Sequence, residues 1–276
     1  MLAIADNNPI RHIRRPWVNY TLIGFCILVF LINPPYQLYG FTPANLWLAG
    51  NPGTAPGWDT VLLQSVSYIF LHGDLFHLAG NMVVLWVFGS SIEDSMGHAR
   101  YPLFFILCGM AGALAESLMG ADPHVPVVGA SGAIAGVMGA YLLLHPNARV
   151  LVLLAFRVPV LVPASVFVGL GIVLDLVSAL VPDPESDVMI AWWAHIGGFA
   201  AGALLILVMR HRDVALFQPA TAYPDSFRRL RWLMINLTPR PGADQSGTTL
   251  GRQVLVGLKS LAFFVIIVVI IETIFA

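Results

Sequence analysis

The chain has 276 residues, of which 58% are hydrophobic and only 11% are charged, whereas about 25% of the residues of a typical soluble domain are charged. This composition excludes an ordinary soluble enzyme and indicates an integral membrane protein, with the lipid bilayer as its surroundings. The formal net charge of −1 at pH 7 leaves no basic excess to balance a phosphate backbone, so we expect no nucleic-acid partner.

Seven apolar stretches are long enough to cross a bilayer, because a spanning helix needs roughly 17 to 25 residues. We therefore expect an all-α membrane protein, a polytopic helical bundle. Cys26 and Cys108 fall inside apolar stretches and are expected to be buried there as small hydrophobic residues. The predicted spans are 17–33, 75–92, 101–119, 128–145, 158–180, 189–209 and 258–275.

Two polar segments lie outside these spans. Residues 1–16 carry basic residues, and no small-residue cleavage pattern follows the first span, so we expect a cytoplasmic tail before an uncleaved helix. Residues 210–257 are predicted to be a cytoplasmic linker. Within it, DSFRRLRWLMINL (225–237) places apolar residues at helical spacing beside arginines. That pattern fits either a helix lying on the membrane surface or a solvated linker.

The basic residues predict the orientation, because Lys and Arg accumulate on the cytoplasmic side. The predicted loops 34–74, 120–127 and 181–188 contain none of them. A cytoplasmic N-terminus therefore places all 14 Lys and Arg residues inside: Arg11, Arg14, Arg15, Arg100, Arg149, Arg157, Arg210, Arg212, Arg228, Arg229, Arg231, Arg240, Arg252 and Lys259.

In this orientation the second, fourth and sixth spans all run from outside to inside, and each has polar residues near its beginning. His77 and Asn81 are four residues apart in the second span and so share one helix face. Ser131 lies within the first turn of the fourth span, in GASGAIAG, and His195 lies about two turns into the sixth. We expect these four side chains to meet at similar depth near the outer boundary of the membrane.

Such a set suits nucleophilic catalysis. His195 would take the proton of Ser131 and return it to a leaving amine. The unsatisfied amides at a helix start, with Asn81 and His77, would stabilise the oxyanion. The residues also allow a purely structural interpretation of Ser131, since small residues are ordinary packing contacts between membrane helices. An ionisable residue such as His195 in an apolar span more often marks a functional site.

Four motifs in this order resemble the rhomboid family of intramembrane serine proteases: HGDLFHLAGN (72–81), GSSIEDSMG (89–97), GASGAIAG (129–136) and AHIGGFAAG (194–202). The resemblance covers roughly residues 60–209. It implies a six-helix core over 17–209 and an additional transmembrane helix within 258–276. It also implies that Ser131 is the nucleophile, His195 the base, Asn81 and His77 the oxyanion residues, and Glu93 a structural residue.

The resemblance further implies a serine endopeptidase that cleaves peptide bonds in or near the transmembrane segments of single-span proteins, without cofactor or metal. A bacterial plasma membrane, with the active site facing outward, is the expected location. The alternative is a non-catalytic rhomboid-like chaperone or a transporter. Metal catalysis is disfavoured because HExxH is absent, and aspartyl catalysis because Asp175 has no evident second carboxylate.

Two features depart from the family's pattern, and two further residues carry unexplained charge. Family members often have an aromatic residue four positions after the nucleophile, where this chain has Ala135, so another group has to hold the imidazole. The first outer loop also lacks an arginine. Glu116 and Asp175 lie near the outer ends of their spans, where water contact is the favoured explanation for their charge.

Overall fold

The computed structural model describes residues 2–6, 8–49, 56–120, 122–154, 158–181, 190–219 and 235–236. The chain forms two compact units, which are treated separately below. The larger unit consists of Ile10–Tyr141 and Gly171–Val214, and the smaller of Met1–Pro9, Leu142–Leu170 and Ala215–Ala276.

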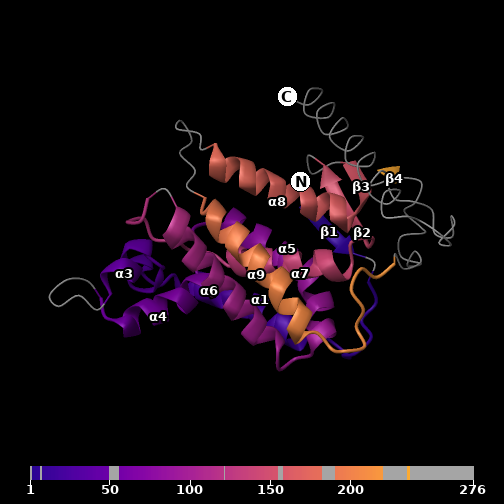
Figure 1. The fold of residues 1–276 in the computed structure, drawn as a ribbon, viewed down its shortest axis with the longest axis horizontal. Coiled ribbons are helices and arrows are strands. Elements are labelled where there is room, and N and C mark those ends of the chain that lie inside the picture. The colour runs from indigo at the N-terminus through magenta and orange to yellow at the C-terminus, as the bar shows by residue number, and fades with distance from the viewer. Residues whose placement is uncertain are drawn as a thin grey trace. The chain divides into compact units, whose positions relative to one another are not determined.

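Each of the six spans predicted before residue 210 contains a helix (Figure 1). Three helices, α5, α6 and α9, are long and apolar enough to cross a membrane, and α1, α7 and α8 are shorter apolar helices. The seventh predicted span, 258–275, lies outside the described residues. The bounds are α1 Trp17–Ile32, α5 Leu75–Met96, α6 Tyr101–Met119, α7 Ser131–Leu144, α8 Ala164–Leu180 and α9 Trp192–Met209.

The smaller unit contains a four-stranded sheet, so the expectation of an all-α chain is wrong and the protein is mostly helical. The strands are β1 (Leu2–Asp6), β2 (Arg149–Leu154), β3 (Val158–Pro163) and β4 (Ile235–Asn236), in the order β1-β2-β3-β4. β2 pairs antiparallel with both β1 and β3, while β3 and β4 are parallel. The β4 residues fall within the segment considered for an interfacial helix; the rest of that helical pattern lies outside the described residues.

The strands explain why α8 begins six residues later than the predicted fifth span. RVLVLL and VPVLVP are rich in valine, whose branched side chain favours strands. Pro159 and Pro163 lack the amide hydrogens that a helix needs in its interior. Val152 and Val160 face each other in the antiparallel pair and are fully buried.

The segment between α1 and α5 is also structured. It contains α2 (Tyr36–Tyr39), α3 (Pro43–Leu48), α4 (Trp58–Ser67) and the 3-10 helix η1 (Tyr68–Phe70). Phe41 and Val127 exchange two backbone hydrogen bonds of 3.0 and 2.8 Å, and the Trp47 indole donates to the Ser117 carbonyl of α6 at 3.2 Å. These bonds attach the segment to α6 and to the loop before α7.

Glu93 joins α1 to α5. It is fully buried, and its carboxylate accepts the backbone amides of Val18 at 3.1 Å and Asn19 at 2.7 Å, in the first turn of α1. The first amides of a helix have no intrahelical partner, so Glu93 caps α1 from a neighbouring helix. The Asn19 side chain donates to the Leu85 carbonyl and accepts from the Tyr101 hydroxyl, which links α1 to α5 and α6. The structural role expected for Glu93 is therefore visible in its contacts.

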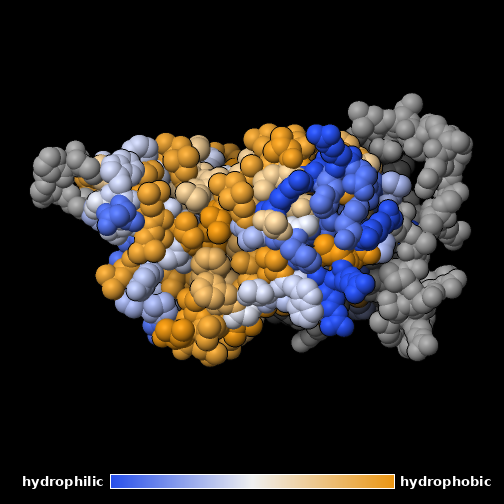
Figure 2. All heavy atoms as spheres, turned by 90° about the horizontal axis from the view of Figure 1, so that it is seen from below, coloured by the Kyte–Doolittle hydropathy of each residue, from blue (hydrophilic) through white to orange (hydrophobic). Residues whose placement is uncertain are grey.

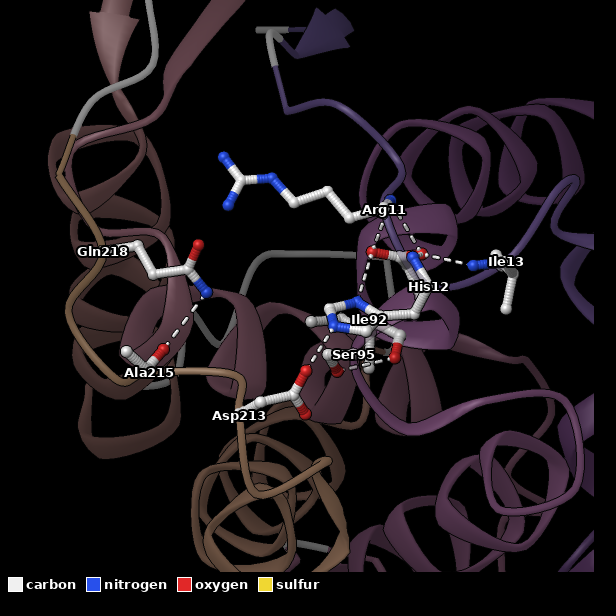
Figure 3. Close-up of polar contacts among 9 residues, drawn as sticks. Arg11, His12, Ile13, Ile92, Ser95, Asp213, Ala215 and Gln218 are labelled. Carbon is white, nitrogen blue, oxygen red and sulfur yellow. Dashed lines mark hydrogen bonds and ion pairs between the residues drawn. The ribbon is translucent and has the colours of Figure 1, made fainter.

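The next residue of α5, Asp94, holds the segment before α1. Its carboxylate accepts the backbone amides of Arg11, His12 and Ile13 at 2.6–3.0 Å. The His12 ring lies 3.3 Å from Asp94 through Nδ1 and 3.1 Å from Asp213 through Nε2 (Figure 3). The N-terminal segment is thus tied both to α5 and to the segment after α9.

The surface of the helices is apolar, as expected for contact with lipid. Exposed leucines occur along α1, α6 and α9, among them Leu28, Leu118 and Leu204. Figure 2 shows apolar side chains, in orange, over much of one face. Cys26 and Cys108 are free and buried, as predicted from their apolar surroundings.

Candidate active site

Ser131 is the first residue of α7, and the loop before it is held by its backbone. The Gly129 amide donates to the Tyr68 carbonyl at 2.9 Å, and the first intrahelical bond of α7 runs from the Ile134 amide to the Ala130 carbonyl. Gly129 has φ of 130°, a conformation that side chains strain. The amides of the first α7 turn, including that of Ser131, therefore have no partner within the helix.

A glycine seam joins α7 to α9, the helices that carry Ser131 and His195. A Cβ on Gly198 would collide with the backbone carbonyl of Gly132, and one on Gly202 with that of Gly136. A Cβ on Gly132 would lie 3.2 Å from the Ala194 carbonyl oxygen. The residue after Ser131 therefore lies close to the backbone of the residue before His195.

His77 lies beside Ser131. Asp74 caps α5 by accepting the His77 amide at 2.8 Å, which fixes the first turn of this helix. A Cβ placed on Gly129 would lie 2.8 Å from His77 Nε2 and 3.7 Å from Ser131 Oγ. The His77 ring and the Ser131 hydroxyl thus surround one point.

Asn81 follows one turn after His77 and is buried, with 8% of its surface exposed. Among the described residues its amide nitrogen Nδ2 has no hydrogen-bond partner. A buried unpaired donor costs about 1–3 kcal/mol, and such groups are rare in folded proteins. The Asn81 amide is available to a bound group.

His195 has a partner that sequence reasoning missed. Its Nδ1 lies 3.2 Å from Oδ2 of Asp175 on α8, and the Trp192 ring meets its ring edge to face at a centroid distance of 5.9 Å. Water contact alone, the favoured explanation for a charged Asp175 in this span, is therefore incomplete. The two residues are twenty positions apart on different helices, so no local pattern signals the contact.

Glu116 also has a protein partner, whereas the sequence favoured water contact alone. Its Oε2 accepts the Ala194 amide of α9 at 3.0 Å, so this α6 carboxylate caps the helix that carries His195. The capping resembles that of α1 by Glu93, and it fixes the backbone directly before His195.

His72 precedes α5 and packs against His77. It is 1% exposed, its ring meets that of His77 edge to face at 5.2 Å, and its backbone carbonyl accepts the Tyr36 hydroxyl at 2.8 Å. Burial, and secondarily the nearby His77, lower the pKa of His72 to about 4. His72 is therefore uncharged at neutral pH.

The structure brings Ser131, His77 and the helix carrying His195 together, with Asn81 one turn along α5. Ser131, His77 and His195 are half-buried and so open to a substrate. No hydrogen bond joins Ser131 to His195 among the described residues, and catalytic hydrogen bonds are often long without substrate. Nor do these residues include a group of three or more His, Cys, Asp or Glu that could hold a metal ion.

Known proteins share this part of the chain. The family model of the Rhomboid domain matches residues 59–212. RHOMBOID-like protein 5 of Arabidopsis thaliana is 32% identical over 145 residues, 52% of this chain and 43% of the relative. Rhomboid protein 1, mitochondrial, of Saccharomyces cerevisiae is 31% identical over 51% of this chain and 40% of its own length.

A bacterial relative carries a protease name. Rhomboid protease GluP of Bacillus subtilis is 31% identical over 137 residues, 50% of this chain and 25% of the relative. The chain spans less than half the length of each of these three relatives.

Proposed function

The chain belongs to the rhomboid family of multi-pass membrane proteins, and from this premise we propose that it is an intramembrane serine endopeptidase. Ser131 is its nucleophile and His195 its general base. The proposal rests chiefly on one observation: Ser131 and His77 surround the same point beside Gly129, while the seam brings the helix of His195 against that of Ser131.

The reaction follows acyl transfer to serine. As Ser131 Oγ forms a bond to the carbonyl carbon of the scissile peptide, its proton passes to Nε2 of His195. His195 then gives this proton to the leaving nitrogen as the carbon–nitrogen bond breaks, which leaves an acyl ester on Ser131. A water molecule, deprotonated by His195, attacks the ester, and the proton returns to Ser131 when the carboxylate product leaves.

The negative charge that develops on the carbonyl oxygen needs donors. The amides at the start of α7, which have no intrahelical partner, and the unpaired Asn81 nitrogen would supply them, and the His77 ring lies at the same place. Removing one such donor in a serine protease costs about 2.7–4 kcal/mol of transition-state stabilisation. The unpaired state of Asn81 makes sense if its partner is a reacting oxygen.

Substrates of this site would be membrane proteins, because the site is carried by apolar helices whose exposed side chains suit lipid. That they are single-span proteins is what the resemblance to the rhomboid family implies. We place the N-terminus in the cytoplasm and the site at the outer side, from the distribution of basic residues. The membrane we propose is a bacterial plasma membrane.

The test is a cleavage assay in liposomes with a panel of labelled single-span substrates. Ser131→Ala and His195→Ala should each abolish product, and Asn81→Ala should lower kcat by about 10²-fold. Ser117→Ala is the matched control, because its hydroxyl only donates to the Ala113 carbonyl of its own helix, and it should cleave like wild type. Equal product from wild type and Ser131→Ala would refute the proposal.

Labelling of wild type with a phosphonate probe, absent in Ser131→Ala, should accompany cleavage. A wild-type protein with neither product nor labelling would favour the non-catalytic chaperone or transporter.

A further inference from the structure

We propose that Asp175 is a positioning residue for His195, so that the reacting groups form a Ser131–His195–Asp175 triad and not a dyad. This inference rests on the proposed function, since it assigns a role to a neighbour of the same site. The observation behind it is the 3.2 Å contact between Asp175 Oδ2 and His195 Nδ1.

Asp175 stands out on its own helix. Its neighbours Val173, Leu174, Leu176 and Val177 are all apolar, and each is at least 41% exposed. An ionisable residue within a membrane helix is costly and usually marks a functional position. The Asp175 side chain is 25% exposed and that of His195 17%, so the two polar groups shield each other from apolar surroundings.

The contact selects the tautomer that the reaction needs. A carboxylate only accepts hydrogen bonds, so the contact forms when the ring proton is on Nδ1. Nε2 then keeps its lone pair for the proton of Ser131. During attack the ring gains this proton and becomes positive, and Asp175 stabilises that charge while itself giving up and receiving no proton.

Asp175 also restrains the rotation of the ring. Ala135 offers no aromatic surface against the imidazole, and the Trp192 contact comes from the same helix as His195, one turn earlier. Trp192 limits the ring from one side, and Asp175 holds Nδ1 from another helix. With the α9 backbone capped by Glu116, the base is fixed in position by its helix and in orientation by Asp175.

Two substitutions test this role with substrate in excess. Asp175→Asn keeps the shape but presents an amide that competes as a donor, and it should lower kcat by about 10²-fold, within the range of general acid–base catalysis. KM should stay within about twofold, since Asp175 holds the base and not the substrate. Asp175→Glu restores a carboxylate and should recover a large part of kcat. The control Asp59→Asn, an exposed carboxylate in α4, should leave both constants unchanged.

Two further measurements separate positioning from folding. The rate of phosphonate labelling of Ser131 should fall with kcat in Asp175→Asn, while the unfolding temperature stays near that of wild type. In ¹⁵N-histidine NMR spectra, with the His195 signal assigned from a His195→Gln sample, the proton should occupy Nδ1 in wild type and be redistributed in Asp175→Asn. This signal does not depend on activity.

An active wild type with an unchanged kcat in Asp175→Asn would overturn the triad and leave the proposed protease intact. So would an unchanged His195 tautomer. If Asp175→Asn and Asp175→Glu both fail to cleave and to fold, Asp175 has a structural role, and the triad is overturned. A wild type that neither cleaves nor labels would instead refute the proposed function.

Discussion

Replacing Glu93 by alanine should destabilise the fold without touching the candidate active site. The carboxylate accepts two backbone amides of α1 and also contacts His98 Nδ1 at 2.5 Å. A hydrogen bond to a charged group contributes about 1.5–3 kcal/mol, so losing the two backbone bonds should cost about 3–6 kcal/mol of unfolding free energy. Glu93→Gln keeps one acceptor oxygen and should cost about half as much.

The free energy of unfolding is measured by titrating the purified protein with a denaturing detergent and following helix content and the fluorescence of tryptophan. His98→Ala is the matched control. It removes the third contact, from a ring that is 46% exposed, and should cost about 1 kcal/mol or less. A Glu93→Ala protein within about 0.5 kcal/mol of wild type, the usual range for a surface substitution, would refute the capping of α1 by α5.

Two other predictions concern the seam and the N-terminal segment. Gly198→Ala forces a methyl group against the α7 backbone. It should lower the free energy of unfolding by about 1–3 kcal/mol and abolish cleavage. Gly24→Ala, with open space around it, should keep the stability and the cleavage of wild type. At His12, burial alone lowers the pKa, but the hydrogen bonds to Asp94 and Asp213 outweigh it and raise the pKa above 6.5. The resulting stabilisation should be complete below pH 6.5 and disappear as the pH rises through the raised pKa.

Comparing wild type with His12→Ala across this range tests the second of these predictions. Protease cleavage of the N-terminal segment should separate the two proteins at pH 5.5 and no longer at pH 8.5. Equal protection of both proteins at pH 5.5 would show that the contacts of His12 with Asp94 and Asp213 do not stabilise the segment. For the seam, normal activity in Gly198→Ala would mean that the two helices tolerate separation.

The helices of the site were predictable because each is an apolar run of the right length with polar residues at its start. The sharing of a face by His77 and Asn81 follows from helical geometry, and the position of Ser131 near a helix start follows from where its apolar run begins. The strands were not predictable in the same way, since a valine-rich run satisfies the hydropathy of a span as well as that of a buried strand. The residues 158–163 were therefore assigned to the fifth span.

The hydrogen-bond partners of three carboxylates could not be predicted from the sequence. Glu93, Glu116 and Asp175 each bond to a residue on another helix, and helix-to-helix contacts depend on packing that one sequence does not encode locally. Their shared feature, an acidic residue inside an apolar helix, does signal that a partner exists. The sequence could identify the residues but not what they bind.

The seam between α7 and α9 has a consequence for how the protein is made. Chains are synthesised from the N-terminus and elements fold as they emerge, so α7 enters the membrane before α8 and α9 have been translated. Until α9 arrives, the glycines of α7 lack their matching surface and Ser131 lacks the base that we propose for it. Under the proposed mechanism, a nascent chain without α9 cannot cleave neighbouring membrane proteins, and it becomes competent only when α9 packs against α7.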